Sequence, residues 1–236
     1  MQLRRGLKAL GGLLRDPDDT AKFATIVESF QGNSVYRLWD RMSASPEGRR
    51  LLQEKPDLLA VLSDHERLRK LPEGTLGRVY LAYCEREGIT GQGLAKVIEE
   101  GYSKTRREQL TDEQIFLGNW MRDSHDLYHL VTGYQTDLIG ELCVLAFTAA
   151  QTRNRGVLIP VSVAFSLGLY FRTPGPKLAV QAVGRSLRAA FFPEQDWIAL
   201  LEKPLGEVRR LLKVGDPPVY EPFYTPGRGP KAVAMA

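Results

Sequence analysis

The sequence predicts an all-α protein, a single-domain helical bundle that ends in an extended tail. Apolar residues recur at the three- and four-residue spacing of a helix along nearly the whole chain, and few segments alternate like a strand. No Gly- or Pro-rich linker divides the 236 residues, so we expect one compact domain. The predicted parts are a basic helix over 1–15, the main helical domain over 16–213 and a Pro-rich tail over 214–236.

Capping and breaking residues predict where the helices begin and end. Ser45-Pro46 is a helix start, because serine caps a helix and proline at its first position loses no hydrogen bond. Thr111-Asp112-Glu113-Gln114 has the form of a capping box and predicts a long helix that ends near Gly133. Asp137 can then cap a helix from Leu138 to about Ala150. Further boundaries are expected at Asp16-Pro17, Gly32-Asn33, Lys55-Pro56, Leu71-Pro72, Gly88 and Gly101.

The net charge of +4 arises at the N-terminus, where residues 1–15 carry four cations and no acid. The leucines of this segment share one helical face, which predicts an amphipathic helix docked on the domain or on a membrane surface. Because the basic residues are not interleaved with aromatic ones and no recognition motif is present, we expect no nucleic-acid partner. The cations are Arg4, Arg5, Lys8 and Arg15, and the leucines are Leu3, Leu7, Leu10 and Leu14.

Cysteine usage and hydropathy predict a reducing compartment and no membrane span. Cys84 and Cys143 lie far apart in apolar segments, so we expect two buried thiols and no disulfide. The N-terminus lacks the continuous apolar core of a secretory signal. The uncharged stretch Gly156–Phe171 is shorter than the roughly 17 to 25 residues of a spanning helix and contains Pro160. It is interpreted either as a buried helix or as an apolar face lying in a membrane interface.

Two of the three histidines stand four residues apart, in His125-Asp126-Leu127-Tyr128-His129. Residues at this spacing project from the same side of a helix, so both imidazoles can reach one ion. Asp126 lies three residues before His129 and adds a carboxylate. Two nitrogens and an oxygen suit zinc foremost, and also iron, manganese or cobalt, better than they suit calcium. The motif therefore predicts a divalent metal site.

A further ligand is expected from the next helix, at Glu141. This acid lies in an otherwise apolar run, where a carboxylate is costly to bury unless it is paired or bound to a cation. The break at Gly133 lets that helix fold back toward the histidines. Arg122, one turn before Asp126, is expected to orient the Asp126 carboxylate from behind the ligands. The predicted metal ligands are His125, Asp126, His129 and Glu141.

The pattern His-Asp-x-x-His, eleven residues, then Glu resembles the motif of the ubiquinone-biosynthesis Coq-four family. Arg122, Gly133 and Gly140 agree with the family as well, whereas residues 142–147 are more apolar than is usual there. The resemblance extends from about residue 16 to residue 213. Its outer segments are Ser45-Pro-Glu-Gly48, Leu71-Pro-Glu-Gly-Thr-Leu-Gly77 and Glu202-Lys203-Pro204-Leu205.

The resemblance implies a peripheral membrane protein of coenzyme Q synthesis that works with other enzymes of the pathway and with polyprenyl benzoate or quinone precursors. It further implies a reaction in which the carboxyl group at the first ring carbon is removed and a hydroxyl takes its place. A metal with an open position suits this as a Lewis acid or redox centre. The implied location is the cytoplasmic face of an inner membrane, or the matrix face in mitochondria, and a homodimer is allowed. The implied catalytic residues are the same four, His125, Asp126, His129 and Glu141.

Three other functions fit parts of the same pattern. A non-catalytic, lipid-binding scaffold would use the metal only for structure, with a saturated coordination shell. An HD-type phosphohydrolase needs a further histidine and aspartate, for which His65 and Asp137 are candidates, but His65 lies in a charged run typical of an exposed helix face. A metallopeptidase is disfavoured, because aspartate is too short to serve well as the general base and no strand-rich half is predicted.

Overall fold

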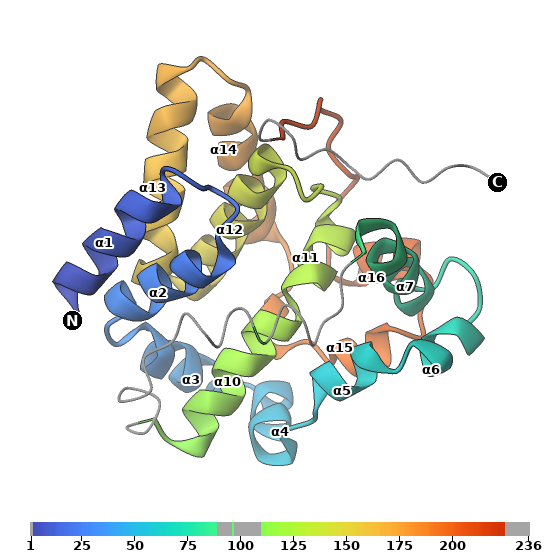
Figure 1. The fold of residues 1–236 in the computed structure, drawn as a ribbon. Helices are drawn as coiled ribbons and strands as arrows, with labels where there is room; N and C mark the ends of the chain where they lie inside the picture. The colour runs from blue at the N-terminus through green and yellow to red at the C-terminus, as the bar shows by residue number, and fades with distance from the viewer. Residues whose placement is uncertain (1, 89–95, 97–109, 225–236) are drawn as a thin grey trace.

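The computed structural model describes residues 2–88, 96 and 110–224. Over these residues the protein is all-α, as predicted, and an isolated bridge between Thr75 and Pro204 is the one β-type pairing. Figure 1 shows α10, α11 and α12 crossing the middle of the molecule, with the other helices around them. The helices are α1 (Leu3–Leu13), α2 (Thr20–Phe30), α3 (Ser34–Ala44), α4 (Pro46–Glu54), α5 (Leu58–Ser63), α6 (His65–Lys70), α7 (Leu76–Glu87), α10 (Asp112–Asp123), α11 (His125–Thr132), α12 (Leu138–Thr152), α13 (Arg155–Tyr170), α14 (Gly175–Arg188), the 3-10 helix η1 (Phe192–Glu194), α15 (Trp197–Leu200) and α16 (Leu205–Leu211).

Most helix boundaries lie where the capping residues predict them. Ser45 accepts a hydrogen bond from the backbone of Gly48 at the start of α4, and Asp137 caps α12. Residues 111–114 form a complete capping box ahead of α10. Gly88 ends α7 in the left-handed conformation. The boundary predicted at Gly101 lies outside the described residues.

The long helix predicted between Thr111 and Gly133 is divided at Ser124. The backbone N–H and the hydroxyl of Ser124 both donate to the carbonyl of Trp120, at 3.0 and 2.8 Å. A serine hydroxyl that bonds to the carbonyl four residues earlier competes with the regular helix pattern and often bends it. His125 therefore becomes the first residue of a separate helix, α11.

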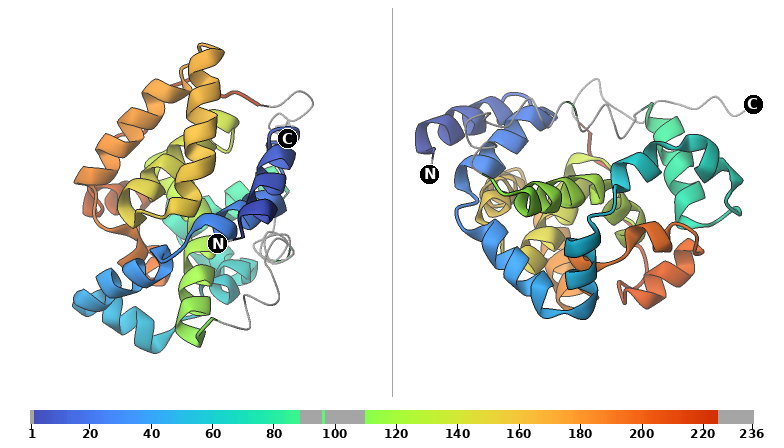
Figure 2. Two further views of the ribbon diagram at one scale, coloured as in Figure 1. Left: turned by 90° about the vertical axis from the view of Figure 1, so that its left-hand side faces the viewer. Right: turned by 90° about the horizontal axis from the view of Figure 1, so that it is seen from below.

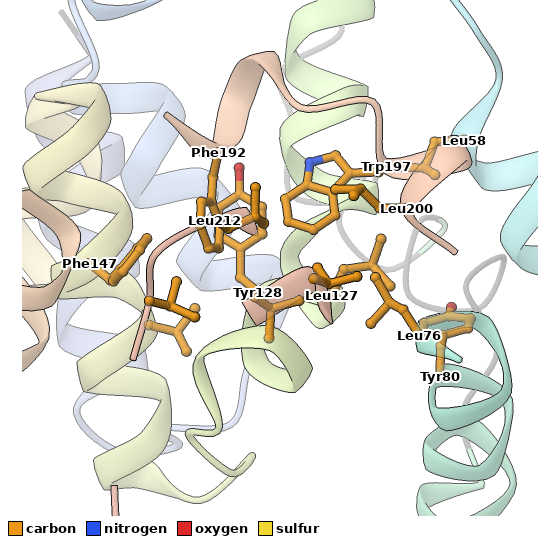
Figure 3. Close-up of a cluster of buried hydrophobic side chains, with 14 of the residues drawn as sticks. Leu58, Leu76, Tyr80, Leu127, Tyr128, Phe147, Phe192, Trp197, Leu200 and Leu212 are labelled. Atoms are coloured by element: carbon orange, nitrogen blue, oxygen red, sulfur yellow. The ribbon is translucent and has the colours of Figure 1, made fainter. Parts of the chain in front are cut away.

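One face of α11 is anchored in the main hydrophobic core. Leu127, Tyr128 and Val131 are all buried. The ring of Tyr128 packs edge-on against Phe192, with 4.9 Å between ring centroids, and Figure 3 shows Trp197 beside the same pair. Full burial of each large apolar side chain contributes about 1.5–3 kcal/mol to folding. The core thus holds α11 firmly and fixes the direction of its opposite face.

The N-terminal helix α1 docks on the domain with a different face from the one predicted. Ala9 packs on Ile26 and Phe30 of α2, and Gly6 lies so close to Phe30 that a Cβ there would come within 2.3 Å of its ring. Arg5 also forms an ion pair with the buried Glu28 of α2. The side of α1 that contacts α2 is centred on Gly6 and Ala9, next to the predicted leucine face. Of the four leucines, Leu10 packs inward, whereas Leu3, Leu7 and Leu14 are exposed.

The uncharged stretch after Arg155 forms α13, which continues through Pro160. Its buried residues are mostly small, and several of its large apolar side chains are exposed, so the interpretation as a buried core helix holds only for one side. Among the residues described, none of the helices combines the length and the apolar character needed to cross a bilayer. Cys84 and Cys143 are buried free thiols, as predicted.

The described part of the predicted tail, residues 214–224, is extended and docked on the domain. Val214 is buried, and Arg185 of α14 donates to the carbonyls of Val214 and Asp216 at 3.0 and 3.1 Å. These hydrogen bonds hold the segment after α16 on the domain, and the residues that follow reach the turn between α11 and α12.

Candidate metal centre

The two histidines of the motif project from the face of α11 opposite to its core residues. Each residue of a helix turns by about 100°, so His125 and His129 lie about 40° apart, whereas Leu127 and Val131 lie on the far side. His129 is 2 % exposed and His125 is half-buried. The packing of α11 into the core therefore aims both imidazoles at the same point.

Glu141, in the first turn of α12, meets both imidazoles. Its Oε2 lies 3.3 Å from Nε2 of His125 and its Oε1 lies 3.2 Å from Nε2 of His129, while the two Nε2 atoms are 3.2 Å apart. Donor atoms about 2.0–2.1 Å from a tetrahedral zinc ion are about 3.3 Å from one another. Each of these three separations is thus close to what two ligands of such an ion require, with the two imidazoles approaching different oxygens of the carboxylate. Within the described ranges this is the one group of three or more potential metal-ligating side chains.

The turn between α11 and α12 sets the position of Glu141. Gly133 ends α11 with φ 80°, a conformation that residues with a Cβ rarely adopt. Asp137 caps α12 by accepting the N–H two residues further on, at 3.0 Å. A Cβ on Gly140 would come within 1.8 Å of the carbonyl oxygen of Gln135, so no side chain fits at this position. Both glycines of the motif are therefore required by the geometry of the turn.

The C-terminal segment braces the same turn. The hydroxyl of Tyr220 donates to Asp137 Oδ2 at 2.7 Å and accepts from the backbone N–H of Gln135 at 2.9 Å. The backbone N–H of Phe223 donates to Asp137 Oδ1 at 2.9 Å. A Pro-rich composition predicts an extended tail but cannot show where it docks. Tyr220 thus supports the centre without touching it.

The backbone fixes the orientation of the His129 ring. Its Nδ1 lies 3.1 Å from the carbonyl oxygens of both Tyr134 and Gln135, which accept its hydrogen. An imidazole that donates from Nδ1 presents Nε2 as its metal-binding atom, and such backing is usual for histidines that bind metals. His129 is therefore aligned for binding by the loop that joins the two helices.

The charged groups of the centre shift one another's pKa values. Burial alone would lower the pKa of His129, but the charge of Glu141, its hydrogen bond and the charge of Asp126 raise that pKa to about 9. Burial would raise the pKa of Glu141, but the charge of His129 and hydrogen bonds from both imidazoles hold it well below its usual range. At neutral pH a protonated imidazole faces a carboxylate, so a cation has to displace that proton.

Asp126 is buried beside the centre but outside the group of three. Burial raises the pKa of its carboxyl, although the positive charges of His125 and His129 act in the opposite direction. Its oxygens are not among the donor atoms that lie within 4.8 Å of one another. The buried Asp126 carboxylate and the partly buried Glu141 carboxylate beside two imidazoles favour a divalent cation, because a second negative charge near the pair needs compensation. That Asp126 is itself a ligand stays a prediction.

Arg122 contacts the neighbouring side chains of α10. Its Nε and Nη2 donate to Asp123 at 2.7 and 3.1 Å, and its Nη1 donates to Asn119 at 3.2 Å. The Arg122–Asp123 pair is almost fully enclosed, with side chains 6 % and 7 % exposed. The predicted orientation of Asp126 by Arg122 stays a prediction.

The centre opens onto an apolar cavity of about 580 Å³. This volume lies in the range typical of small-molecule sites. His125, Asp126 and Glu141 form part of its wall, and the side chain of Glu141, 39 % exposed, borders the cavity. Leucines and valines of α2, α12 and α13 make up much of the remaining wall, including Val27, Leu142, Leu145, Val157, Val161 and Val163. The free side of the metal centre thus faces a hydrophobic space.

Tyr83 is a site residue that sequence analysis missed. It lies on α7, lines the same cavity and is 5 % exposed, and its hydroxyl makes no hydrogen bond within the part of the chain that the structure describes. Burial and the charges of Asp126 and Glu141 raise the pKa of this phenol, so it keeps its proton. A tyrosine in an apolar helix is ordinarily a core residue, and only the packing of α7 on α11 brings this one to the site.

The structure does not support the HD-type arrangement. Both carboxylate oxygens of Asp137 are engaged, with the backbone at α12 and with Tyr220. His65 is the first residue of α6 and is outside the group formed by His125, His129 and Glu141.

The raised pKa of His129 predicts that metal binding depends on pH. Below pH 9 this imidazole carries a proton that zinc must displace, so binding at pH 7 should release about one proton from it. The association constant should then rise about tenfold per pH unit and level off above about pH 9. Calorimetry in buffers of different ionisation enthalpy measures the released protons, and H65A, which alters a histidine outside the centre, should release the same number. Proton release near zero at pH 7 would contradict the prediction.

Comparison with known proteins identifies the family. The family model described as "Coenzyme Q (ubiquinone) biosynthesis protein Coq4" matches residues 6–218. The chain is 31 % identical over 190 residues to the mitochondrial ubiquinone biosynthesis protein COQ4 of Pyricularia oryzae, a match that covers 78 % of this chain and 58 % of the relative. It therefore spans less than two thirds of that relative. The mitochondrial COQ4 homolog of Danio rerio is 28 % identical over 215 residues, with 87 % of this chain and 73 % of the relative covered.

A solved structure shares the fold. The crystal structure of a Nostoc punctiforme protein assigned to ubiquinone biosynthesis superimposes with a TM-score of 0.66 at 24 % identity, covering 90 % of this chain and 98 % of the other. Sequence and fold agree with the resemblance seen in the His-Asp-x-x-His and Glu pattern. The chain belongs to the Coq4 family of coenzyme Q (ubiquinone) biosynthesis proteins.

Proposed function

We propose that this protein is a metal-dependent enzyme of coenzyme Q biosynthesis that acts on a polyprenylated benzoate and replaces the carboxyl group at the first ring carbon by a hydroxyl. The observation that carries the proposal is the meeting of two imidazole nitrogens and one carboxylate, 3.2–3.3 Å apart, at the wall of an apolar cavity. A charged centre in an apolar space suits a substrate with an acidic ring and a hydrocarbon tail. Membership in the Coq4 family supports coenzyme Q biosynthesis as the pathway in which the protein acts.

The residues fit a divalent metal, with zinc foremost. His125, His129 and Glu141 would hold it, and three protein ligands leave a position open for a substrate, as in catalytic rather than structural zinc sites. When bound, such an ion supplies Lewis acidity toward a carboxylate or a ring oxygen. The same donors also suit manganese or cobalt, and two histidines with one carboxylate are a common iron-binding set.

The protein's own groups bind and orient the substrate in this proposal. The apolar cavity wall holds the polyprenyl chain and keeps water from the ring. The hydroxyl of Tyr83 donates a hydrogen bond to an oxygen of the ring or of its carboxyl group. Asp126 balances the charge of the cation from its buried position, and the loop carbonyls hold His129 in one orientation.

The proposed reaction balances only with an oxidant. The bond between the ring carbon and the carboxyl carbon breaks, carbon dioxide leaves, and an oxygen atom becomes bonded to the same ring carbon. The substrate loses two electrons in this exchange. Either water supplies the oxygen atom and a two-electron acceptor, such as dioxygen reduced to hydrogen peroxide, takes up the electrons, or dioxygen supplies the atom and two further electrons and two protons reduce its second oxygen to water.

The proposed setting is the surface of an inner membrane, on the matrix side in a mitochondrion, beside other enzymes of the pathway. The relatives from Pyricularia oryzae and Danio rerio are named mitochondrial. A polyprenyl substrate partitions into a bilayer, so an enzyme acting on it has to meet the membrane.

Removing a ligand tests the metal-dependent role. H125A and E141A should each lose the bound metal, measured by elemental analysis of protein purified without chelator. Turnover of the C1-carboxylated precursor, followed by lipid mass spectrometry, should fall at least about 100-fold, because the open metal position is lost. H65A is the matched control and should keep both. If the variants lose metal while turnover stays normal, the reaction does not need the metal and the proposed role of the centre is wrong.

The Tyr83 hydroxyl is expected to bind substrate. Because it has no partner in the described protein, Y83F should leave metal content and melting temperature unchanged. It should weaken binding of a short-chain C1-carboxylated analogue about fivefold, the worth of one net hydrogen bond. Y80F alters a buried tyrosine of the same helix that does not line the cavity and should bind the analogue like the unmodified protein. Unchanged affinity of Y83F would remove Tyr83 from the site.

A further inference from the structure

The C-terminal end of α13 displays large apolar side chains to the solvent. Leu169, Tyr170 and Phe171 are 59 %, 79 % and 68 % exposed, and Leu167 just before them is 42 % exposed. The two aromatic rings pack edge to face, with 5.0 Å between their centroids. We name residues 167–172 the α13 tip. Exposed aromatic side chains gathered at one place on a surface indicate a binding surface, whereas singly scattered ones do not.

The α13 tip is a well-anchored part of the fold. The backbone N–H of Thr173 donates to the carbonyl of Gly168 at 2.9 Å, and Arg172 takes a left-handed conformation with φ 55° that turns the chain into α14. A Cβ on Gly168 would come within 2.8 Å of Pro176, so the end of α13 and the start of α14 are in close contact. The aromatic pair is therefore presented by a defined turn between two helices.

The chain segment that contains the α13 tip carries only positive charge. No acid occurs between Glu141 and Glu194, and the same segment has six Lys and Arg residues. Two of them, Arg172 and Lys177, are exposed at or next to the tip. Aromatic side chains flanked by cations are typical of protein surfaces that sit among phospholipid headgroups, where the rings enter the interface and the cations meet phosphates. Charge complementarity thus selects an anionic lipid surface.

The α13 tip lies beside the opening of the cavity. Five of the residues that line the cavity are exposed: Ala164 and Leu167 on α13, Leu14 and Pro17 at and after the end of α1, and Gly118 on α10. Figure 2 (left) shows α1 and α13 on the same face of the molecule, diverging from one another. The cavity therefore reaches the surface between these two helices, with the tip on one side of its mouth.

The other side of the mouth has a related character. On α1, Leu3, Leu7 and Leu14 are exposed, and the exposed cations Arg4 and Lys8 lie beside them. A helix with this pattern lies readily in a membrane interface. The acids nearest the mouth are Asp16, Asp18 and Asp19 of the following turn, where Asp19 caps α2 and pairs with Lys22. The side of the mouth formed by α13 therefore suits an anionic lipid surface better than the side formed by α1.

We propose that the α13 tip inserts into the surface of an anionic phospholipid bilayer, with α1 lying against it, so that the mouth of the cavity faces the lipid. The proposal deepens the proposed function by naming the surface that meets the membrane, and it rests on that function only for the identity of the lipid that enters. A polyprenyl chain could then pass from the bilayer to the metal centre without crossing water.

Vesicle binding tests the anchor. The full chain should co-sediment with phosphatidylcholine vesicles that contain phosphatidylglycerol, and much less with phosphatidylcholine alone. The triple variant L169S/Y170S/F171S should lower the partition coefficient at least about tenfold, because three exposed apolar side chains are lost. The matched control Y36S/L187S/L211S removes three exposed apolar side chains of α3, the C-terminal part of α14 and α16, all outside the tip, and should bind like the unmodified protein. Equal binding of the tip variant, or equal loss in the control, would overturn the proposal.

A second readout does not depend on the triple variant. F171W places an indole at the tip, and its fluorescence should shift to shorter wavelength when anionic vesicles are added. Absence of a shift while the protein is bound would show that another surface meets the lipid. Light scattering of the unmodified protein and the triple variant without vesicles completes the test. A dimer that the variant converts to a monomer would show that the tip is covered by a second copy, which also overturns the proposal.

The test separates this proposal from the proposed function. The vesicles contain no quinone precursor, and binding is measured before and after treatment with a chelator. Tip-dependent binding that survives chelation supports the anchor even if the metal-dependent reaction is disproved. Conversely, turnover of a short, water-soluble precursor that is unaffected by L169S/Y170S/F171S would support the reaction independently of the anchor.

Discussion

The contact of Glu141 with the imidazoles of His125 and His129 requires a particular geometry of the surrounding helices and turn. The two Nε2 atoms lie 3.2 Å apart, and each lies 3.2–3.3 Å from one of the two Glu141 oxygens, because α11 and α12 meet across a short turn. Gly133 and Gly140 allow that turn, and Asp137 caps the second helix. On its other face α11 is fixed by buried aromatic packing around Tyr128. The packing of α11 in the core and the turn before α12 therefore together fix the positions of the three side chains of the centre.

The cation-binding groups and the apolar cavity form one continuous site. Groups that attract a cation occupy one part of the cavity wall, while the remaining wall is mostly apolar. Such a division separates a polar head from a hydrocarbon tail, and it gives the substrate a single orientation at the centre. The mouth of the same cavity lies among exposed apolar and basic side chains of α1 and α13. A path from lipid to metal centre then needs no additional feature of the fold.

Local patterns predicted a large part of this arrangement. The helical class, the caps at Ser45, residues 111–114 and Asp137, and the left-handed end at Gly133 follow from short-range chemistry that is written in neighbouring residues. The approach of Glu141 to the histidines was predictable as well, because one turn separates their helices and a lone acid in an apolar run needs a partner.

Features set by distant contacts were not predictable from such patterns. The side of α1 that docks depends on the fit of Gly6 against Phe30, which a helical wheel does not contain. Tyr83 reaches the cavity because α7 packs on α11. The docking of Tyr220 on Asp137 joins residues 83 positions apart. The exposure of Tyr170 and Phe171 opposes the general tendency of aromatic residues to be buried, and only the folded structure reveals it.

X-ray absorption at the metal edge tests directly whether His125, His129 and Glu141 bind the ion. In the zinc-loaded protein we expect a first shell of nitrogen and oxygen at about 2.0–2.1 Å, with the outer-shell scattering of two imidazoles. H125A and E141A, which should not retain the metal, should show no zinc edge above the background. A shell without imidazole scattering, or a spectrum that H125A and E141A leave unchanged, would contradict the account, because the ion would then be bound elsewhere.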